Sequence, residues 1–351
     1  CFLVASILTC RALAMGTSAA SAVLIEQNSG RILYQQNADE ERLIASITKI
    51  MTAVVALEHA DKGCSYTVTA RDMAEGSSMY LKPGDTLLLE ELLYGLMLAS
   101  GNDAALAVAH CVSGETEDFV ALMNETARRL GMTHTHFANP NGLDAEGHYS
   151  SARDMAVLAA YALKNQDFRR IVSTASVTIG ERYLANHNKL LRLYGGCIGV
   201  KTGFTKAAGR TLVSAAAREG MTLVCATLND GDDWNDHMAL LDYGFANYHM
   251  ETAVPAGQVL ASVLVQGGTA VSIPLTASED LSYPLTGEES LKVVARVPLS
   301  IPAPVVPGQA VGEVCAYLED QEVARVDLVA AAPSAKKERV PAPSSWWDKV
   351  F

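Results

Sequence analysis

The sequence predicts an α+β domain, in which a mixed sheet is covered by helices, followed by a small all-β domain. A strand–turn–strand pattern comes first, segments with a helical period follow, and strand patterns return before a last helix. After about residue 250 the helical period gives way to short alternating runs separated by Gly, Pro and Asp. The chain has 351 residues, of which 49% are hydrophobic and 19% charged, so it has enough apolar material for two packed domains.

The elements of the first domain follow one another clearly. The stretch "SAVLIEQNSGRILYQQNAD" predicts a hairpin with strands at 22–25 and 31–34. Apolar residues from Ile47 to Leu57 recur with a helical period that ends by Gly63, so a helix begins near Ser46. Further helices are expected at about 89–99, 103–112, 116–130, 151–164 and 233–248. Strands are expected between 176 and 228, with a hairpin turn at Glu219 and Gly220.

The chain ends suggest export. Residues 1–22 are apolar and then small, with "ALA" at 12–14 and "ASA" at 20–22, which is typical of a signal peptide whose start is missing. Lipidation at Cys10 is an alternative that the bulky Thr9 disfavours. The last residues, "SSWWDKVF", suit either a disordered tail or the start of a membrane-interfacial anchor. We therefore expect a leader at 1–22, domains at 23–250 and 251–331, and a linker and tail at 332–351.

Charge and cysteine content exclude several classes of partner. The net charge is -12 and no basic stretch is long enough to follow a phosphate backbone, which argues against nucleic acid. Five widely spaced cysteines follow the leader, and they resemble buried free thiols more than a disulfide framework or zinc site. His134 and His136 alternate without a third ligand at a useful spacing, so a structural role is favoured. We expect no metal and no other cofactor.

The stretch "ASITKIMTA", residues 45–53, places Ser46 and Lys49 three residues apart at the start of the predicted helix. This spacing brings both side chains to one face of the helix. A lysine can take the proton of a serine only if it is neutral near pH 7, which burial and a second cation nearby would favour. The alternative interpretation is an ordinary N-cap serine beside an exposed lysine.

Two later motifs favour the catalytic interpretation. "SGN" at 100–102 is expected in a loop between two helices, and "KTG" at 201–203 lies where a strand begins. The order S-x-x-K, S-x-N, K-T-G is typical of penicillin-binding proteins and class A β-lactamases. With "MYLKPGD", "FVALMNETARRLGMTHTHFANPNGLD" and "IPAPVVPGQAVGEV", residues 23–331 resemble the low-molecular-mass penicillin-binding proteins that act as serine-type D-alanyl-D-alanine carboxypeptidases. The resemblance implies a β-lactamase/transpeptidase-like domain followed by a C-terminal β-domain.

The resemblance also implies roles for the motif residues. Ser46 would attack the carbonyl between the two terminal D-alanines of a peptidoglycan stem peptide, with Lys49 as the general base. Ser100 would pass the proton to the leaving D-alanine, assisted by the charge of Lys201. Asn102 would hold the substrate amide and fix Lys49. Water would then hydrolyse the acyl-enzyme, and β-lactam antibiotics would acylate the same serine.

Substrate binding is assigned to the K-T-G strand and one cation. Residues 201–204 (Lys201, Thr202, Gly203 and Phe204) would pair with the extended substrate, and the backbone N–H of Phe204 would join that of Ser46 in an oxyanion hole. The family often places an arginine before K-T-G, where this chain has His187 in "NHNK". Arg210, at the start of the neighbouring strand, is the alternative partner for the terminal carboxylate.

Two rival functions remain to be separated from this one. A β-lactamase shares the nucleophile, but here Gly101 replaces the aspartate of S-D-N, and "MTHTHFANPNGLDAEG" offers only Asp144 and Glu146 for deacylation. A non-catalytic cell-wall-binding or sporulation-associated module would keep the fold and lose the reactive side chains. Asp144 and His148 could border the cleft, although a turn or capping role is favoured. We expect an exported enzyme at the outer face of the plasma membrane or in the cell wall.

Overall fold

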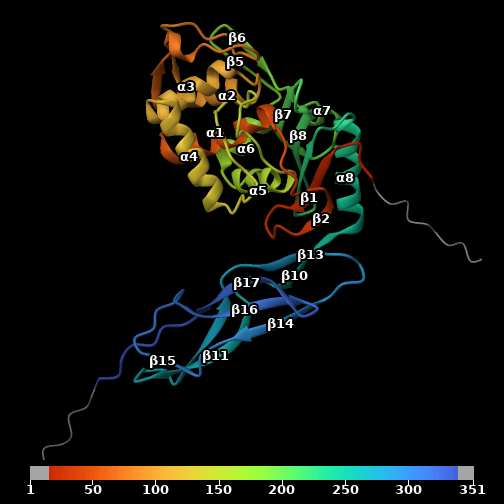
Figure 1. Ribbon diagram of the computed structural model, residues 1–351. Coiled ribbons are helices and arrows are strands. Elements are labelled where there is room, and N and C mark those ends of the chain that lie inside the picture. The colour runs from red at the N-terminus through yellow and green to blue at the C-terminus, as the bar shows by residue number, and fades with distance from the viewer. Residues whose placement is uncertain (1–15, 339–351) are drawn as a thin grey trace, which may run out of the picture. The chain divides into compact units, whose positions relative to one another are not determined.

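The protein is represented by a computed structural model that describes residues 16–338 (Figure 1). The chain divides into two compact units between Ala246 and Asn247. Residues 1–15, which hold most of the expected leader, and residues 339–351, which hold the tryptophan-containing tail, lie outside the described range. Within residues 16–338, no helix is both long and apolar enough to cross a bilayer.

The first unit is built on a five-stranded sheet with the order β2-β1-β9-β8-β7. All four pairings are antiparallel, which refines the expected mixed sheet. The predicted turn at Glu219 and Gly220 joins β8 to β9, and both residues have positive φ, as a type I′ hairpin turn requires. The strands are β1 (Ser21–Glu26), β2 (Ile32–Gln36), β7 (Cys197–Thr205), β8 (Gly209–Arg218) and β9 (Met221–Leu228).

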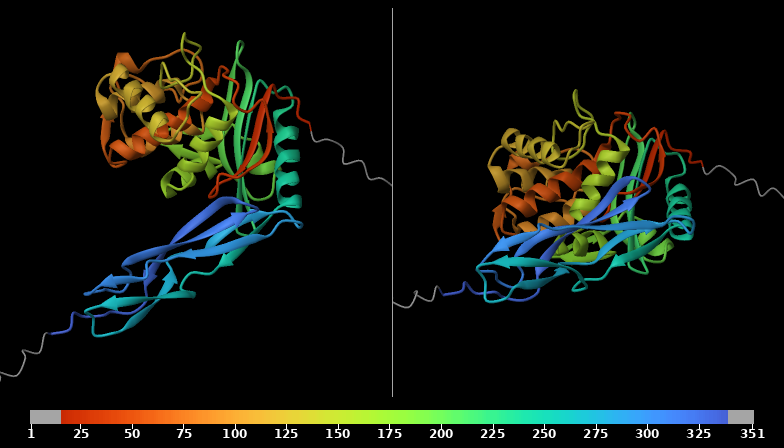
Figure 2. Two further views of the ribbon diagram at one scale, coloured as in Figure 1. Left: turned by 60° about the horizontal axis from the view of Figure 1, so that its bottom comes forward. Right: turned by 90° about the horizontal axis from the view of Figure 1, so that it is seen from below.

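Helices cover both faces of this sheet, so its central strands are buried on both sides (Figure 2). On one face α8 (Asp233–Asn247) packs closely at Gly244, where a Cβ atom would lie 2.5 Å from Leu223 and 2.9 Å from Leu24. The other face carries the main core with the remaining helices. These are α1 (Lys49–His59), α2 (Leu89–Met97), α3 (Asn102–Ser113), α4 (Thr116–Arg129), α5 (Ala152–Ala162), α6 (Gln166–Ser173) and the short α7 (Leu190–Leu193), whereas α8 spans Asp233–Asn247.

The structure differs from the sequence prediction in several elements. The helix that carries Lys49 is preceded by a 3-10 turn, η1 (Ala45–Thr48), so Ser46 precedes the α-helix proper. The strand β1 begins at Ser21, so the first unit starts before residue 23 and the "ASA" at 20–22 overlaps a buried strand. Of the two expected cleavage sites, only "ALA" at 12–14 leaves β1 whole. The elements not predicted are α6, α7, a second 3-10 turn, η2 (Ala70–Asp72), and the small hairpin of β3 (Ser65–Thr67) with β4 (Thr86–Leu88), whereas the hairpin of β5 (Ser176–Ile179) with β6 (Arg182–Ala185) opens the stretch where strands were expected.

The second unit is all-β, as predicted. Its six-stranded sheet has the order β14-β16-β17-β12-β11-β15, and β10 and β13 form a separate pair. Alternate residues of β11 and β12, such as Val263 and Ile273, pack into a core of their own. The strands are β10 (His249–Val254), β11 (Val259–Gln266), β12 (Ser272–Ala277), β13 (Leu281–Leu285), β14 (Leu291–Arg296), β15 (Ser300–Pro302), β16 (Ala310–Leu318) and β17 (Gln321–Ala330).

The five cysteines of the described range are all free thiols. Cys225 and Cys315 are buried, as expected, whereas Cys111 and Cys197 are partly buried. Cys64 is exposed because it lies in the turn before β3, so the expectation that all five are buried is wrong for this residue.

Candidate active site

One cleft of about 480 Å³ brings together the motifs that the sequence singled out. Its wall is formed by Ser46 of η1, Ser100 of the S-x-N loop and residues 202–204 of β7. Beneath this surface lie Lys49, Asn102 and Lys201, whose exposed fractions are 0%, 4% and 1%. The remaining lining residues are Ser77, His187, Arg210, Asp233 and Trp234.

The amine of Lys49 is held by two carbonyl oxygens and faces the serine. Its N–H groups donate to Asn102 Oδ1 at 2.8 Å and to the backbone oxygen of Asn141 at 2.5 Å, and Nζ lies 2.9 Å from Ser46 Oγ. The amide of Asn102 is oriented by its Nδ2 group, which donates to the Glu75 oxygen at 2.7 Å. A neutral amine has two N–H donors and one lone pair. Since both carbonyls can only accept, the lone pair is left for the proton of Ser46.

Burial keeps the lysine neutral. Complete desolvation lowers the pKa of Lys49 well below its ordinary value, and the nearby charge of Lys201 lowers it further. Asp103 acts in the opposite direction and only partly offsets these effects. Burial alone lowers the pKa of Lys201 to about 7. Two buried lysines close enough to interact therefore provide the second cation that the sequence analysis required.

The strained turn before Ser46 is held by a neutral histidine. Ala45 has a φ of +49°, an unusual conformation for a residue with a side chain. The Ala138 N–H donates to His148 Nδ1, so the other ring nitrogen carries the proton and donates to Thr48 Oγ1 at 2.8 Å. The Thr48 hydroxyl in turn donates to the Ala45 oxygen at 2.8 Å. Burial lowers the pKa of His148 to about 4, which keeps the ring neutral.

The loop 139–143 closes the site from below, a role that the sequence analysis missed. Gly142 has a φ of +85°, and a Cβ atom there would lie 2.1 Å from the Ala45 oxygen. The Asn139 side chain accepts from the Gly142 N–H at 2.7 Å, and the Pro140 oxygen accepts from Thr52 at 2.6 Å. These contacts present the Asn141 carbonyl to Lys49. The cluster "NPNG" was recognisable as a turn, but nothing in the sequence showed that its backbone would reach the base.

Gly203 of the K-T-G motif allows β7 to approach the nucleophile. A Cβ atom at this position would lie 2.4 Å from Thr211 Oγ1, 2.9 Å from the Ser46 nitrogen and 3.1 Å from the Ile47 nitrogen. Thr211 fixes the same region by donating to the Ile44 oxygen at 3.0 Å. The backbone of β7 therefore lies directly against the amide of Ser46, where an oxyanion would be bound.

Asp103 anchors the S-x-N loop to the segment 77–81. Its carboxylate accepts from Ser78 Oγ at 2.6 Å and from the N–H groups of Met79 and Leu81 at 3.1 and 3.0 Å. The Asn102 N–H donates to the Ser77 oxygen at 2.7 Å. Because Ser77 lines the cleft, these contacts connect one wall of the cleft to the residue that holds Lys49.

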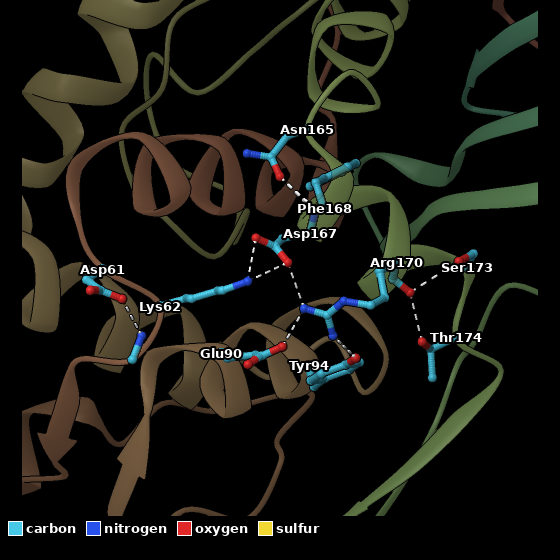
Figure 3. Close-up of polar contacts among 11 residues, drawn as sticks. Asp61, Lys62, Glu90, Tyr94, Asn165, Asp167, Phe168, Arg170, Ser173 and Thr174 are labelled. Carbon is cyan, nitrogen blue, oxygen red and sulfur yellow. Dashed lines mark hydrogen bonds and ion pairs between the residues drawn. The ribbon is translucent and has the colours of Figure 1, made fainter.

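A second set of ion pairs connects α2 with α6 (Figure 3). Arg170 of α6 pairs with Glu90 of α2 at 2.5 Å and donates to Tyr94 at 2.7 Å, and Asp167 pairs with Lys62 at 2.7 Å. The helix α6 also packs on β7, where Gly199 leaves space for Val172. The network thus joins the helix that leads into the S-x-N loop to the helix that supports the K-T-G strand.

Comparison with known proteins identifies the family to which this arrangement belongs. The sequence profile described as D-alanyl-D-alanine carboxypeptidase matches residues 9–232, and the profile described as penicillin-binding protein 5, C-terminal domain, matches residues 248–334. The chain belongs to the D-alanyl-D-alanine carboxypeptidase family. Members of this family are serine peptidases that act on peptidoglycan peptides and are acylated by penicillins.

Individual relatives of this carboxypeptidase family match nearly the whole chain. The D-alanyl-D-alanine carboxypeptidase DacF of Bacillus subtilis is 37% identical over 337 residues, which cover 91% of this chain and 86% of the relative. DacC of Escherichia coli is 33% identical over 327 residues, covering 88% and 82%. The crystal structure of penicillin-binding protein 5 from Haemophilus influenzae aligns with a TM-score of 0.77 and 28% identity over 92% of this chain and 98% of that one. The predicted family and fold class are therefore confirmed.

In this carboxypeptidase the two candidate carboxylate partners differ in charge. Arg210 lies opposite Phe204 in the β7–β8 pairing and lines the cleft, but its guanidinium already pairs with Asp233 at 2.8 Å and lies over the Trp234 ring. The side chain of Arg210 is 44% exposed, so part of the guanidinium remains accessible. His187 also lines the cleft, and burial together with Lys201 lowers the pKa of its ring, so it is uncharged at neutral pH.

The residues left out of the predicted site have structural partners. Asp144 accepts from Thr205 at 2.9 Å, and His136 lies 2.6 Å from the Gly147 oxygen. His134 lies 3.7 Å from Glu41. In the described part of the chain, no three His, Cys, Asp or Glu side chains converge as metal ligands would.

Proposed function

We propose that this chain removes the terminal D-alanine from peptidoglycan stem peptides through an acyl-enzyme at Ser46. The observation that supports this most is the orientation of the Lys49 amine, whose two N–H groups are bound to carbonyl oxygens while Nζ lies 2.9 Å from Ser46 Oγ. A buried, neutral lysine in this position is a general base for a serine nucleophile.

In acylation, Ser46 Oγ bonds to the carbonyl carbon of the penultimate D-alanine while its proton moves to Lys49 Nζ. The developing oxyanion accepts from the backbone N–H groups of Ser46 and Phe204. The carbon–nitrogen bond to the last D-alanine then breaks, and the proton reaches the leaving nitrogen through Ser100, whose hydroxyl lines the same cleft. The charge of Lys201 favours this transfer by keeping the Lys49 ammonium acidic.

In deacylation, water attacks the ester carbonyl and gives its proton to Lys49, which returns it to Ser46 Oγ as the shortened peptide leaves. The substrate backbone lies along residues 201–204, of which Thr202, Gly203 and Phe204 line the cleft. Asn102, fixed between Lys49 and Glu75, borders the substrate amide.

We place this activity outside the cytoplasm, at the outer face of the plasma membrane. This location is supported by the apolar leader with a small-residue site at 12–14, by a peptidoglycan substrate, and by the Trp and Lys residues of the tail. The net charge of -12 argues against nucleic acid as a partner.

The decisive experiment combines a penicillin label with product analysis. We expect the wild-type chain to form a stable adduct with a fluorescent penicillin and to release D-alanine from a peptide ending in D-Ala-D-Ala. Ser46→Ala should abolish both reactions. A chain without adduct would be a binding module, and rapid release of opened penicillin without release of D-alanine would indicate a β-lactamase.

A further inference from the structure

One end of the β-domain exposes large aliphatic side chains. Leu264 of β11 is 53% exposed, Val271 before β12 is 74% exposed, Leu299 before β15 is 92% exposed and Val306 after β15 is 60% exposed. We call these four residues the apolar end. Scattered single exposures are common on soluble domains, but a group of them marks an interaction surface.

Backbone pairing shows that the four residues belong to adjoining segments. Leu264 pairs with Ser300, which follows Leu299, and the Val265 N–H donates to the Val271 oxygen at 2.9 Å. The Ala303 N–H donates to the Gln266 oxygen at 3.0 Å, which brings the segment before Val306 to the same end of β11. The loops around β11 and β15 are therefore one surface.

The same surface lacks charge. No Asp, Glu, Lys or Arg occurs in residues 259–278, 297–312 or 328–335, although 19% of the whole chain is charged. Charged side chains gather instead on β14, β16 and β17, where Arg296 pairs with Glu313 and Glu322. This separation is not needed for packing, because the residues of the apolar end lie outside the core.

The chain leaves the β-domain at this end and becomes basic there. Val305 pairs with Ser334, Gly268 pairs with Lys336, and the Lys337 N–H donates to the Gly267 oxygen at 2.8 Å. Lys336 and Lys337 are exposed beside the uncharged loops. Glu338 follows the two lysines, and residues 339–351 include Arg339, two adjacent tryptophans and a lysine. Aliphatic side chains next to lysines suit the boundary of an anionic bilayer.

We propose that the apolar end of the β-domain is a membrane-contact surface, which inserts its aliphatic side chains among the headgroups of an anionic bilayer while Lys336 and Lys337 bind the phosphates. This inference rests on the proposed extracytoplasmic location. It differs from an anchor in the tail alone, because the folded domain supplies its own contacts. Short tails bind membranes weakly, and a second contact would fix the domain at the surface.

The test measures binding of the full chain to vesicles of 70% phosphatidylcholine and 30% phosphatidylglycerol. Leu264→Ser, Val271→Ser and Leu299→Ser should each lower the partition coefficient by about threefold or more, and the triple variant by at least tenfold, because less apolar surface enters the interface. Val259→Ser is the matched control, since Val259 is 59% exposed at the other end of β11. The control should bind like the wild type.

The tail is controlled separately. In a full-length Trp346→Ser, Trp347→Ser background, residual binding should still depend on Leu299 and should weaken in pure phosphatidylcholine or at high salt.

Unchanged binding of the triple variant, or an equal loss in the Val259→Ser control, would overturn the proposal. A wild type that sediments as a dimer and a triple variant that sediments as a monomer would assign the surface to self-association instead. Penicillin labelling should be the same in all variants, so failure of this inference is distinguishable from failure of the proposed activity.

Discussion

Lys49 Nζ lies 2.9 Å from Ser46 Oγ, and the same nitrogen is bound by the carbonyl oxygens of Asn102 and Asn141. The two carbonyls do more than orient the side chain. They accept both N–H groups of a neutral amine, whereas an ammonium would have to direct its third N–H toward the serine. Burial and the charge of Lys201 lower the pKa of Lys49, and in the resulting neutral state the two carbonyls leave the lone pair for Ser46, so that the lysine can act as a base.

The base assignment predicts a specific loss in Lys49→Arg. A guanidinium keeps its proton at any working pH, so acylation should fall by at least about 1,000-fold. Stopped-flow measurement of acylation by a fluorescent penicillin gives the rate, and a thermal melt shows whether the variant is folded. Normal acylation by a folded Lys49→Arg protein would contradict the assignment.

The pH dependence of acylation should respond in opposite directions to two neighbouring charges. Lys49 reacts when neutral, so the rate rises as the pH passes through its lowered pKa. Lys201→Gln removes a cation that lowers this pKa, and the rising limb should move to higher pH. Asp103→Asn removes an anion that raises it, and the limb should move to lower pH.

The rising limb is obtained from the acylation rate measured between about pH 5 and 8. This range includes the pKa of Lys201, which is about 7, so the charge of Lys201 changes within it. The position of the limb is compared and not the plateau, because both variants will also lower the maximal rate. A shift of both variants in the same direction would show that the two charges do not act through Lys49.

Gly203→Ala should disturb the active site more than it destabilises the rest of the five-stranded sheet. The added Cβ would lie 2.4 Å from Thr211 Oγ1 and 2.9 Å from the Ser46 nitrogen, so β7 must move away from η1. We expect acylation to fall by about 100-fold or more, as for a lost oxyanion contact. Gly195→Ala is the control, because no atom lies within 4 Å of its added Cβ. Similar acylation rates in the two variants would refute the proposed contact.

Arg210→Ala tests which cation recognises the terminal carboxylate. The guanidinium shares its charge with Asp233, yet it is the charged candidate of the two, since His187 is neutral. We expect kcat/KM for a D-Ala-D-Ala peptide to fall by about 1.5 to 3 kcal/mol of transition-state binding. The loss should be much smaller for the same peptide with an amidated C-terminus.

Removal of Arg210 also leaves Asp233 unpaired, so a thermal melt of each variant is required. Asp233→Asn separates the two effects, because it keeps Arg210 and releases its guanidinium for the substrate; kcat/KM should then be kept or increased. Equal losses on the free and amidated peptides would exclude Arg210 as the carboxylate site and turn attention to His187 and Lys189.

The sequence by itself determined the order of the elements, the change to an all-β domain after about residue 250, and the three motifs. These features are local: periodicity marks α1 to α5, and the Glu219–Gly220 pair between two apolar runs marks the turn between β8 and β9. Spacing alone placed Ser46 and Lys49 on one face, because residues three apart meet at the start of any helix.

Only the tertiary structure decided which groups make the lysine a base and which partners occupy the other site residues. The Asn141 carbonyl reaches Lys49 across 92 residues, His148 reaches Thr48 across 100, and Asp233 pairs with Arg210 because α8 begins beside β8. The small α6 was missed although Phe168, Ile171 and Val172 follow a helical spacing, because eight residues are shorter than the window over which a helical period is recognised. The physical reason is the same in each case: desolvation, charge pairing and backbone approach depend on residues brought together by packing, and no local pattern records which distant segment will supply them.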